Sequence, residues 1–292
     1  MSAVRLIVAG ILIAAAFVCA ALYQNHNGAT TEQHVNARQA QALIRSRFDQ
    51  LVACDTTKHH CDINAHLHTM REYAMRSRSV VEMGVRGVVG TWAFLDGLVA
   101  SNRSDSFQLG VDLNMCDYGP VVHLGRSAGV RVAFMQADST IAPIPPRDLL
   151  FIDTLHVYGL LRRELARHAA DTRCFILLHD TTSDGSRGEV LRLGMDKDAV
   201  VKQTGFPLSE VTRGLWPAVE EFLSAHASEW RLHRRYTHTN GLTILVRRDA
   251  TCAVPAVGGE TGAVEDVIRL QKSPARRRKV PLRTSRKGKA LA

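Results

Sequence analysis

The middle of the chain alternates short apolar runs with segments in which apolar residues recur at helical spacing. Five runs are continuous enough to be strands buried on both faces: SVVEMG (79–84), SFQLGVDLN (106–114), VRVAFMQAD (130–138), DLLFIDT (148–154) and RCFILLHDTT (173–182). Helical spacing between them predicts helices over 91–99, 119–128 and 158–168. Such alternation is typical of a parallel sheet covered by helices on both faces.

Two further β runs follow a predicted helix over 214–226. They are WRLHRRYTH (230–238) and GLTILVRR (241–248), and Asn240-Gly241 at their junction is a tight-turn signal. A terminal hairpin places an antiparallel strand in the sheet. We therefore predict an α/β fold that is Rossmann-like and doubly wound, with a mostly parallel seven-stranded sheet and an antiparallel C-terminal strand.

The residues before the first strand are organised differently. Helical spacing covers 37–52, and Asp62 is a candidate N-cap for a second helix that ends near Arg76. We divide the chain into four parts: an N-terminal anchor or signal (1–24), a linker and helical cap (25–76), a catalytic domain (77–250) and a basic tail (251–292).

The N-terminal segment is apolar from Leu6 to Tyr23, with Arg5 in front of it. This length approaches the roughly 20 residues that cross a bilayer as a helix. We predict membrane association through residues 4–23, with Arg5 favouring a cytoplasmic N-terminus. A cleaved signal, with small residues at Val18-Cys19-Ala20, is the alternative, and it would make the protein secreted.

The net charge of +9 comes from the C-terminal tail. Residues 272–292 contain nine Lys and Arg and no acid, so the remainder of the chain is close to neutral. A solvated tail or a weak contact with an anionic partner explains such a run. No aromatic residues interleave the basic ones, so nucleic-acid binding by base stacking is not supported.

The six cysteines form no dense framework and no CxxC motif. Cys54 and Cys61 lie close in CDTTKHHC, a spacing that matches no common zinc pattern. A disulfide in an oxidising compartment and two free thiols are both open. We favour the free thiols.

Chemistry-bearing residues recur where the five predicted parallel strands end. Ligands of open parallel sheets bind beyond the carboxyl ends of the strands. A single acid at such a place is most simply a helix cap, but a complete series predicts a site. The series is Glu82, Asp112, Asp138, Asp153 and the pair His179 and Asp180.

Three glycines, Gly84, Gly87 and Gly90, follow the first strand and lead into a helix. A glycine turn there lets a ligand approach the backbone, and an acid after the second strand suits a ribose diol. That combination predicts a dinucleotide or S-adenosylmethionine. The spacing G-x-x-G-x-x-G differs from the nicotinamide fingerprint G-x-G-x-x-G.

Several of these segments together resemble the class I S-adenosylmethionine-dependent methyltransferases. The resemblance rests on VVEMGVRGVVGTWAF, GVDLN, LLFIDTLHVYGLLRREL, FILLHDTT and the C-terminal GLWPAVEEFL…W…NGLTIL, over about residues 62–248. The nearest branch holds cephalosporin hydroxylase-like and metal-dependent O-methyltransferase proteins. The family form E-x-G-x-x-x-G-x-S is not kept, because the next glycines here stand at 87 and 90.

The resemblance implies a cofactor role for each matching position. The first motif would contribute Glu82, Gly84, Val85, Arg86 and Gly87. Asp112 would take the ribose hydroxyls, and Asp138 or its neighbour Ala137 would lie at the adenine.

The resemblance also implies a divalent metal, with Mg²⁺ as one candidate, at Asp153 and Asp180. His179 or Thr181 stands where the metal-dependent members carry an oxygen ligand, and imidazole suits a softer divalent ion better than Mg²⁺. The alternative is structural: Asp153 caps a helix and Asp180 holds a loop.

His156 is the candidate base for methyl transfer. It lies three residues after Asp153, and imidazole titrates near neutrality, so it is able to take a proton from a substrate hydroxyl. The segment HDTTSDGSRGE (179–189) is rich in turn formers and predicts a mobile substrate loop.

These residues predict a membrane-associated methyltransferase that acts on an oxygen of a small molecule or glycan. A nicotinamide-dependent oxidoreductase on the same fold is the first alternative. A non-enzymatic module that binds through the basic tail is the second. The sequence leaves a monomer and a homo-oligomer both open.

Overall fold

The structure, a computed structural model, describes residues 35–54 and 61–256. The predicted membrane segment (4–23) and nearly all of the basic tail lie outside these residues. Among the described helices, none has the length and apolar character needed to cross a bilayer.

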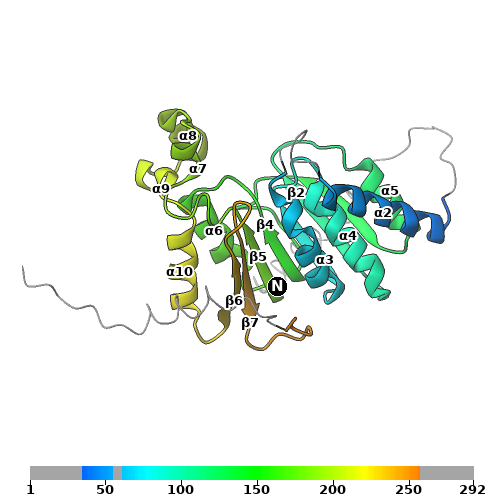
Figure 1. Cartoon of the computed structure of the whole chain (residues 1–292). Helices are drawn as coiled ribbons and strands as arrows, with labels where there is room; N and C mark the ends of the chain where they lie inside the picture. The colour runs from blue at the N-terminus through cyan, green and yellow to red at the C-terminus, as the bar shows by residue number, and fades with distance from the viewer. Residues whose placement is uncertain (1–34, 55–60, 257–292) are drawn as a thin grey trace, which may run out of the picture. The chain divides into compact units, whose positions relative to one another are not determined.

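A seven-stranded sheet forms the centre of the fold (Figure 1), in the order β3-β2-β1-β4-β5-β7-β6. β7 runs antiparallel to both of its neighbours, and the other described strands are parallel to one another. This confirms the predicted Rossmann-like fold class. The strands are β1 (Ser79–Met83), β2 (Phe107–Asp112), β3 (Arg131–Gln136), β4 (Arg147–Ile152), β5 (Thr172–His179), β6 (Trp230–Tyr236) and β7 (Leu242–Arg247).

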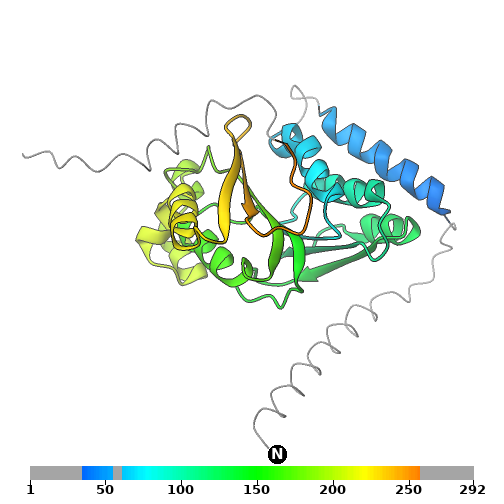
Figure 2. The ribbon, with the colours of Figure 1, turned by 90° about the horizontal axis from the view of Figure 1, so that it is seen from below.

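Helices cover both faces of this sheet. One face carries α3 (Leu67–Met75), α4 (Val89–Ser101) and α5 (Gly119–Ser127), and the other carries α6 (Tyr158–His168) and α10 (Trp216–Ala225). The helix α2 (Ala37–Val52) packs on α4 and α5 from outside, away from the strands (Figure 2). The 3₁₀ turn η1 (Ile63–His66) has Asp62 as its N-cap, whose side chain accepts a hydrogen bond from the Ile63 amide, and α3 follows it directly and ends before Arg76.

The strands are apolar throughout because both of their faces are buried. On β4, Leu149 and Phe151 join the core beneath α3 and α4, whereas Leu150 and Ile152 join the core beneath α6 and α10. β5 alternates in the same way. A single slip of register would exchange these two sets, so the pattern fixes the pairing of the strands.

Three short helices after β5 were not predicted: α7 (Glu189–Arg192), α8 (Lys197–Thr204) and α9 (Leu208–Thr212). Val190, Val200 and Val211 from these helices form a small separate core with Val157, the residue before α6. In Figure 1 they lie at the upper left, beyond the ends of the parallel strands.

The segment 179–189 is not the free loop that its composition suggested. Backbone hydrogen bonds tie it to the chain before α10: the Leu215 amide donates to the Asp184 carbonyl, and the Trp216 amide donates to the Gly185 carbonyl. Asp184 is fully buried. The turn-forming residues therefore build a packed corner.

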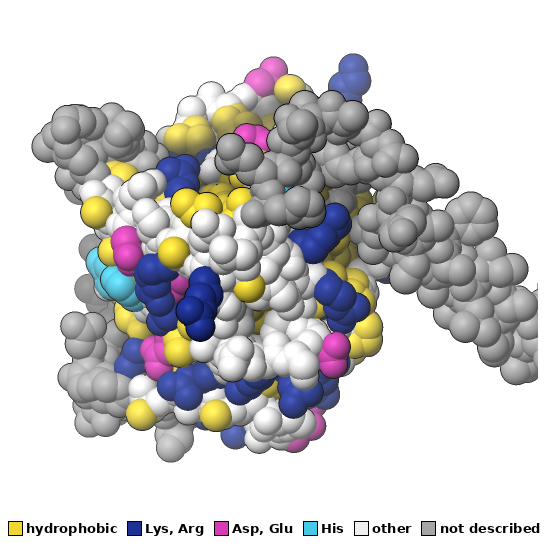
Figure 3. Space-filling model, turned by 90° about the vertical axis from the view of Figure 1, so that its right-hand side faces the viewer, with side chains coloured by type: hydrophobic (Ala, Val, Ile, Leu, Met, Phe, Trp, Pro, Cys, Tyr) yellow, Lys and Arg dark blue, Asp and Glu magenta, His cyan; other side chains and the backbone are white. Residues whose placement is uncertain are grey.

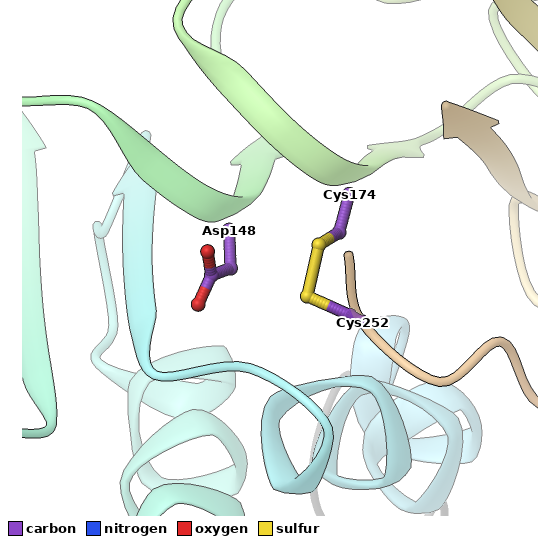
Figure 4. Close-up of side chains that lie close together, drawn as sticks. All are labelled: Asp148, Cys174 and Cys252. Atoms are coloured by element: carbon purple, nitrogen blue, oxygen red, sulfur yellow. A yellow bond between two sulfur atoms is a disulfide. The ribbon is translucent and has the colours of Figure 1, made fainter. Parts of the chain in front are cut away.

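Two disulfides link Cys54 with Cys61 and Cys174 with Cys252. The first corrects the expectation of two free thiols. The second joins the start of β5 to the segment after β7 (Figure 4), at the edge of the sheet opposite the carboxyl ends of the parallel strands. Asp148 lies beside this disulfide, but both sulfur atoms are bonded to each other and so do not form a metal site with it.

The surface around α2 and α5 is mixed in character (Figure 3). Basic side chains there lie among hydrophobic and acidic ones. This face therefore presents no uniform block of one charge.

Candidate functional site

The carboxyl ends of five parallel strands meet at one edge of the sheet. The chain runs from β1 outward through β2 to β3, and then returns to β4 on the other side of β1. β1 and β4 are therefore neighbours at a topological switch point, the place where open α/β sheets bind their ligands. The Gly84 turn lies on one side of this point, and Asp153 lies on the other.

The glycines after β1 serve different purposes. Gly84 has φ +81°, and a Cβ there would lie 2.1 Å from the Asp153 carbonyl oxygen, so only glycine lets the ends of β1 and β4 meet. Gly90 leaves room for a carboxylate, since its Cβ would lie 2.9 Å from Glu82 Oε1. A Cβ on Gly87 would have no contact shorter than 3.8 Å. The sequence predicted a close approach of a ligand to this backbone. At Gly84 the group that approaches closely is the backbone of the same chain at Asp153.

Asp112 holds the glycine turn from the end of β2. Its Oδ2 accepts hydrogen bonds from the backbone amides of Val85 (2.8 Å) and Arg86 (3.0 Å), and its Oδ1 accepts one from the Asn114 amide (2.9 Å). The structure therefore brings together Gly84, Val85, Arg86 and Asp112, as predicted. A carboxylate has about four acceptor positions, so Asp112 retains capacity for a ligand hydroxyl.

Three side-chain-bearing residues at this edge adopt the left-handed backbone region. They are Arg86 (φ 41°), Val88 (φ 59°) and Asp180 (φ 55°). This conformation is uncommon outside glycine and is an outlier for a β-branched valine. Strain of this kind concentrates at functional sites.

Glu82 is enclosed within the fold. Its side chain is buried beneath the start of α4 and accepts a 2.6 Å hydrogen bond from the Thr91 hydroxyl. Burial raises the pKa of Glu82 to about 8. In this arrangement the side chain links the end of β1 to the first turn of α4, and its predicted contact with a cofactor stays a prediction.

Asp138 follows β3 and is exposed. Its Oδ1 accepts hydrogen bonds from the Thr140 amide and hydroxyl, both at 2.7 Å. The neighbouring Ala137 amide donates to the Asp112 carbonyl at 2.9 Å, so the tips of β2 and β3 lie side by side. Asp138 therefore lies at the same edge as Asp112.

His156 lies at the centre of the most highly charged part of the edge. Its Nε2 is 3.0 Å from Asp153 Oδ1 and 3.1 Å from Asp180 Oδ2. Its Nδ1 is 3.3 Å from Asp184 Oδ2 and 3.3 Å from Glu189 Oε2. Carboxylates thus face both ring nitrogens of a buried imidazole. The role of His156 as a base stays a prediction.

His179 completes this cluster from the end of β5. Its Nδ1 lies 3.2 Å from Asp153 Oδ1 and 3.3 Å from Asp180 Oδ2, the same two oxygens that face His156. Thr181 was the other candidate for this position, but its hydroxyl bonds to that of Thr243 on β7 at 2.8 Å. The predicted set of Asp153, His179 and Asp180 is therefore brought together.

The electrostatics of the cluster follow from this arrangement. Burial opposes charge on His156, but the carboxylates of Asp153, Asp184 and Glu189 raise its pKa well above the usual value. Burial also opposes charge on His179, yet the Asp153 carboxylate raises its pKa to about 10. The Asp153 carboxyl is buried too, and the two imidazoles hold its pKa below the usual range.

Four buried or partly buried residues near the site were not found in the sequence. Asp184 and Glu189 come from the corner after β5, where turn composition hid them. Glu164 on α6 accepts hydrogen bonds from Ser139 (2.5 Å) and Thr154 (2.9 Å), which joins the loops after β3 and β4. His66 bonds to the turn before β7 and stacks edge-on to His179, with ring centroids 5.8 Å apart. Of these four residues, only Glu164 left a signal in the sequence, because it is a charged residue at an apolar position of its helix.

Part of the donor set does not suit the magnesium ion that the sequence resemblance allows. One oxygen or nitrogen from each of Asp153, His156 and Asp180 lies within 4.8 Å of the others, and His179 adds a second imidazole. Mg²⁺ prefers oxygen ligands, whereas imidazole suits Fe²⁺, Co²⁺ or Zn²⁺, and Mn²⁺ binds to mixed sets of carboxylate and imidazole. A metal of the second group fits these residues better.

A cavity of about 450 Å³ lies on the helical side of the glycine turn. Gly87, Val88 and Trp92 form one wall, and Leu43 on α2 and Pro120 on α5 lie opposite. None of the residues that line it comes from β4 or β5. It therefore borders the predicted cofactor loop and is separate from the His156 cluster.

No protein-family model matches the chain, and no curated protein matches it either. Solved structures with a similar fold include an O-methyltransferase from Bacillus cereus in complex with SAH (12% identity, TM-score 0.42, 70% of this chain and 91% of that chain). The O-methyltransferase TomG from Streptomyces achromogenes, in complex with SAM, is another (11%, TM-score 0.40, 72% and 89%). At this level of similarity the activity has to be argued from the site itself.

Proposed function

We propose that the chain is an S-adenosylmethionine-dependent methyltransferase that methylates an oxygen of a small molecule or glycan. The observation that carries the proposal is the glycine turn that Asp112 holds at the switch point of the sheet. It offers a close backbone approach and a carboxylate for a ribose diol on one side, and a cluster of acids and imidazoles on the other.

The predicted cofactor-binding and catalytic residues each have a place in this proposal. Asp112 and the turn bind the nucleoside and methionine parts of the cofactor, Asp138 lies toward the adenine, and Glu82 links the end of β1 to the first turn of α4. Asp153 and His156 lie on the acceptor side. The sulfonium is already activated, so in-line placement and removal of one proton suffice for methyl transfer.

The topology favours this function over a nicotinamide-dependent oxidoreductase. The first five strands follow the order of dinucleotide-binding sheets, but β7 is inserted antiparallel between β5 and β6, where those sheets continue in parallel. The glycine spacing G-x-x-G-x-x-G also argues against a nicotinamide cofactor, because it differs from the fingerprint G-x-G-x-x-G.

Calorimetry of the full chain with S-adenosylmethionine and with NADH tests the proposal. We expect S-adenosylmethionine to bind and Asp112→Ala to weaken it by about 10- to 100-fold, the worth of a hydrogen bond to a charged group. Asp49→Ala, an exposed carboxylate on α2, is the control and should leave binding unchanged. Binding of NADH without binding of S-adenosylmethionine would overturn the proposal.

We also propose that the domain lies in an oxidising compartment, attached to a membrane by residues 4–23. Two disulfides and an apolar N-terminal run preceded by Arg5 support this placement. Carbonate extraction should leave the full chain in the membrane pellet, and a maleimide should label Cys174 only after reduction. Soluble protein with an N-terminus near Ala20 would instead indicate a cleaved signal.

A further inference from the structure

We propose that the His156 cluster is a divalent-cation site with mixed nitrogen and oxygen ligands, in which His156 itself is a ligand. The site would select Mn²⁺, Fe²⁺, Co²⁺ or Zn²⁺ over Mg²⁺. This deepens the proposed function and departs from the oxygen-ligand site that the sequence resemblance implies.

The first argument is the convergence of donor atoms. His156 Nε2 and His179 Nδ1 both face the same two oxygens, Asp153 Oδ1 and Asp180 Oδ2, at distances of 3.0–3.3 Å. The four side chains come from the ends of β4 and β5 and the turns that follow them. Asp153, His156 and Asp180 thus offer two oxygens and one nitrogen within 4.8 Å of one another, a mixed donor set that borderline transition metals favour, and His179 lies beside them as a second imidazole.

The second argument is the balance of charge. Four carboxylates surround His156, and Arg192 donates two hydrogen bonds, of 2.6 and 2.8 Å, to one of them, Asp184. Asp153 and Asp180 face the two imidazoles, and Glu189 lies 3.9 Å from Arg192. Metal binding requires neutral imidazoles, and one divalent ion would then balance the two carboxylates of Asp153 and Asp180.

The third argument is the orientation of the ring. Nδ1 of His156 faces Asp184 and Glu189, each at 3.3 Å, on the side opposite Asp153 and Asp180; these are ion-pair distances, and neither contact has hydrogen-bond geometry. Glu189 also accepts a 3.2 Å hydrogen bond from the His156 amide, and its own amide donates to the His156 carbonyl. A carboxylate on the outer nitrogen of a histidine is the usual device that orients a metal-binding imidazole.

This assignment separates His156 from the role of base. A ring whose inner nitrogen binds a cation has no free nitrogen to receive a proton from the acceptor. Asp184 and Glu189 are then positioning residues that act through the His156 ring.

Calorimetry of the chelator-treated full chain with MnCl₂, ZnCl₂ and MgCl₂ tests the ion preference. We expect one Mn²⁺ or Zn²⁺ per chain and Mg²⁺ binding weaker by at least about 100-fold. His156→Ala should weaken Mn²⁺ binding by more than ~100-fold and Asp184→Asn by about 10- to 100-fold.

His226→Ala is the matched control. His226 also faces a carboxylate three residues away, Glu229 at 3.4 Å, but on the exposed end of α10. Its loss should leave Mn²⁺ affinity unchanged. Equal Mn²⁺ affinity in the His156→Ala and wild-type proteins would overturn the assignment, as would a preference for Mg²⁺.

A measurement on the wild-type protein covers the case in which His156→Ala does not fold. Pulsed electron paramagnetic resonance of the Mn²⁺-loaded chain should show couplings to imidazole nitrogen, and their absence would refute nitrogen ligation. Ion binding is measured without S-adenosylmethionine. Its failure therefore refutes only this inference, and failure of S-adenosylmethionine to bind refutes only the proposed function.

Discussion

Asp148 lies near the start of β4 and Asp153 follows its last residue, and the surroundings of these two acids differ in kind. Asp148 accepts hydrogen bonds from the Arg78 amide and from Arg173 Nε, both at 2.7 Å, beside the Cys174–Cys252 disulfide (Figure 4). Asp153 faces two imidazoles and lies near a second carboxylate. Fixed donors satisfy the first acid, whereas groups that change their charge surround the second.

Within one sheet, the amino edge therefore has a structural role and the carboxyl edge holds the candidate site. The amino edge holds the Cys174–Cys252 disulfide and Asp148, whose carboxylate is hydrogen-bonded to the Arg78 amide and to Arg173. These contacts hold the strands together. The carboxyl edge holds left-handed residues and carboxylates in excess of basic partners. A buried acid is therefore a site candidate because of what faces it, and burial by itself does not distinguish the two ends of β4.

The disulfide offers the largest expected effect at the amino edge. Replacing Cys174 and Cys252 together by serine should lower the free energy of unfolding by about 3–4 kcal/mol, because the bridge closes a long loop in the unfolded chain. Denaturant unfolding measures this loss. Cys116→Ser, which removes the free thiol of a half-buried cysteine, is the control.

The same pair of variants should leave Mn²⁺ affinity unchanged when measured under folding conditions. If the double cysteine variant lost both stability and Mn²⁺ affinity, the amino edge and the carboxyl edge would not act separately, and our distinction between them would be wrong.

Exchanging each acid of β4 for its amide tests the comparison directly. Asp153→Asn should weaken Mn²⁺ binding by more than ~100-fold with little change in stability. Asp148→Asn should do the reverse, because its Arg173 partner loses a charged acceptor, and the free energy of unfolding should fall by about 1–3 kcal/mol. Titration calorimetry gives the Mn²⁺ affinity of each variant, and urea unfolding gives its free energy of unfolding. Equal changes of both quantities in the two variants would contradict our interpretation.

Much of the fold could be predicted from the sequence because burial on both faces leaves a strong pattern. The continuous apolar runs of β1, β4 and β5 are visible without any tertiary information. Once these strands are parallel, topology alone brings Gly84, Asp112 and Asp153 to one edge. The predicted helix 37–52 was confirmed to the residue.

The remainder depended on contacts that no local pattern records. α7 and α9 are four and five residues long, too short for a helical period to be recognised. Asp184 and Glu189 reach His156 only because the corner after β5 folds back on α10. Cys174 and Cys252 are 78 residues apart, and spacing of that length predicts no pairing.

Glu164 provides a pH-dependent test of the carboxyl edge. Burial raises its pKa from 4.5 to about 7, so the unfolded chain releases this proton at lower pH than the folded one. The stability associated with Glu164 is thus present below pH ~4.5 and lost as the pH rises through about 7, a change of about 1–3 kcal/mol. Glu164→Gln should flatten this part of the stability curve, measured by urea unfolding between pH 5 and pH 8.

The Glu164→Gln side chain still accepts from Thr154 and Ser139, so the loops should keep their positions. An unchanged slope in the variant would show that other buried groups cause the pH dependence.

Arg86 offers the smallest expected effect and tests whether the cofactor turn acts through its backbone. Its side chain is 78% exposed, and its left-handed backbone suits asparagine better than arginine. Arg86→Asn should therefore raise the free energy of unfolding by about 0.5 kcal/mol, even after the exposed contact with Asp62 is lost. The amide that donates to Asp112 remains, so S-adenosylmethionine affinity should not change. A clear loss of affinity in calorimetry would assign cofactor binding to the guanidinium and would move that contact from the backbone of the turn to its exposed side.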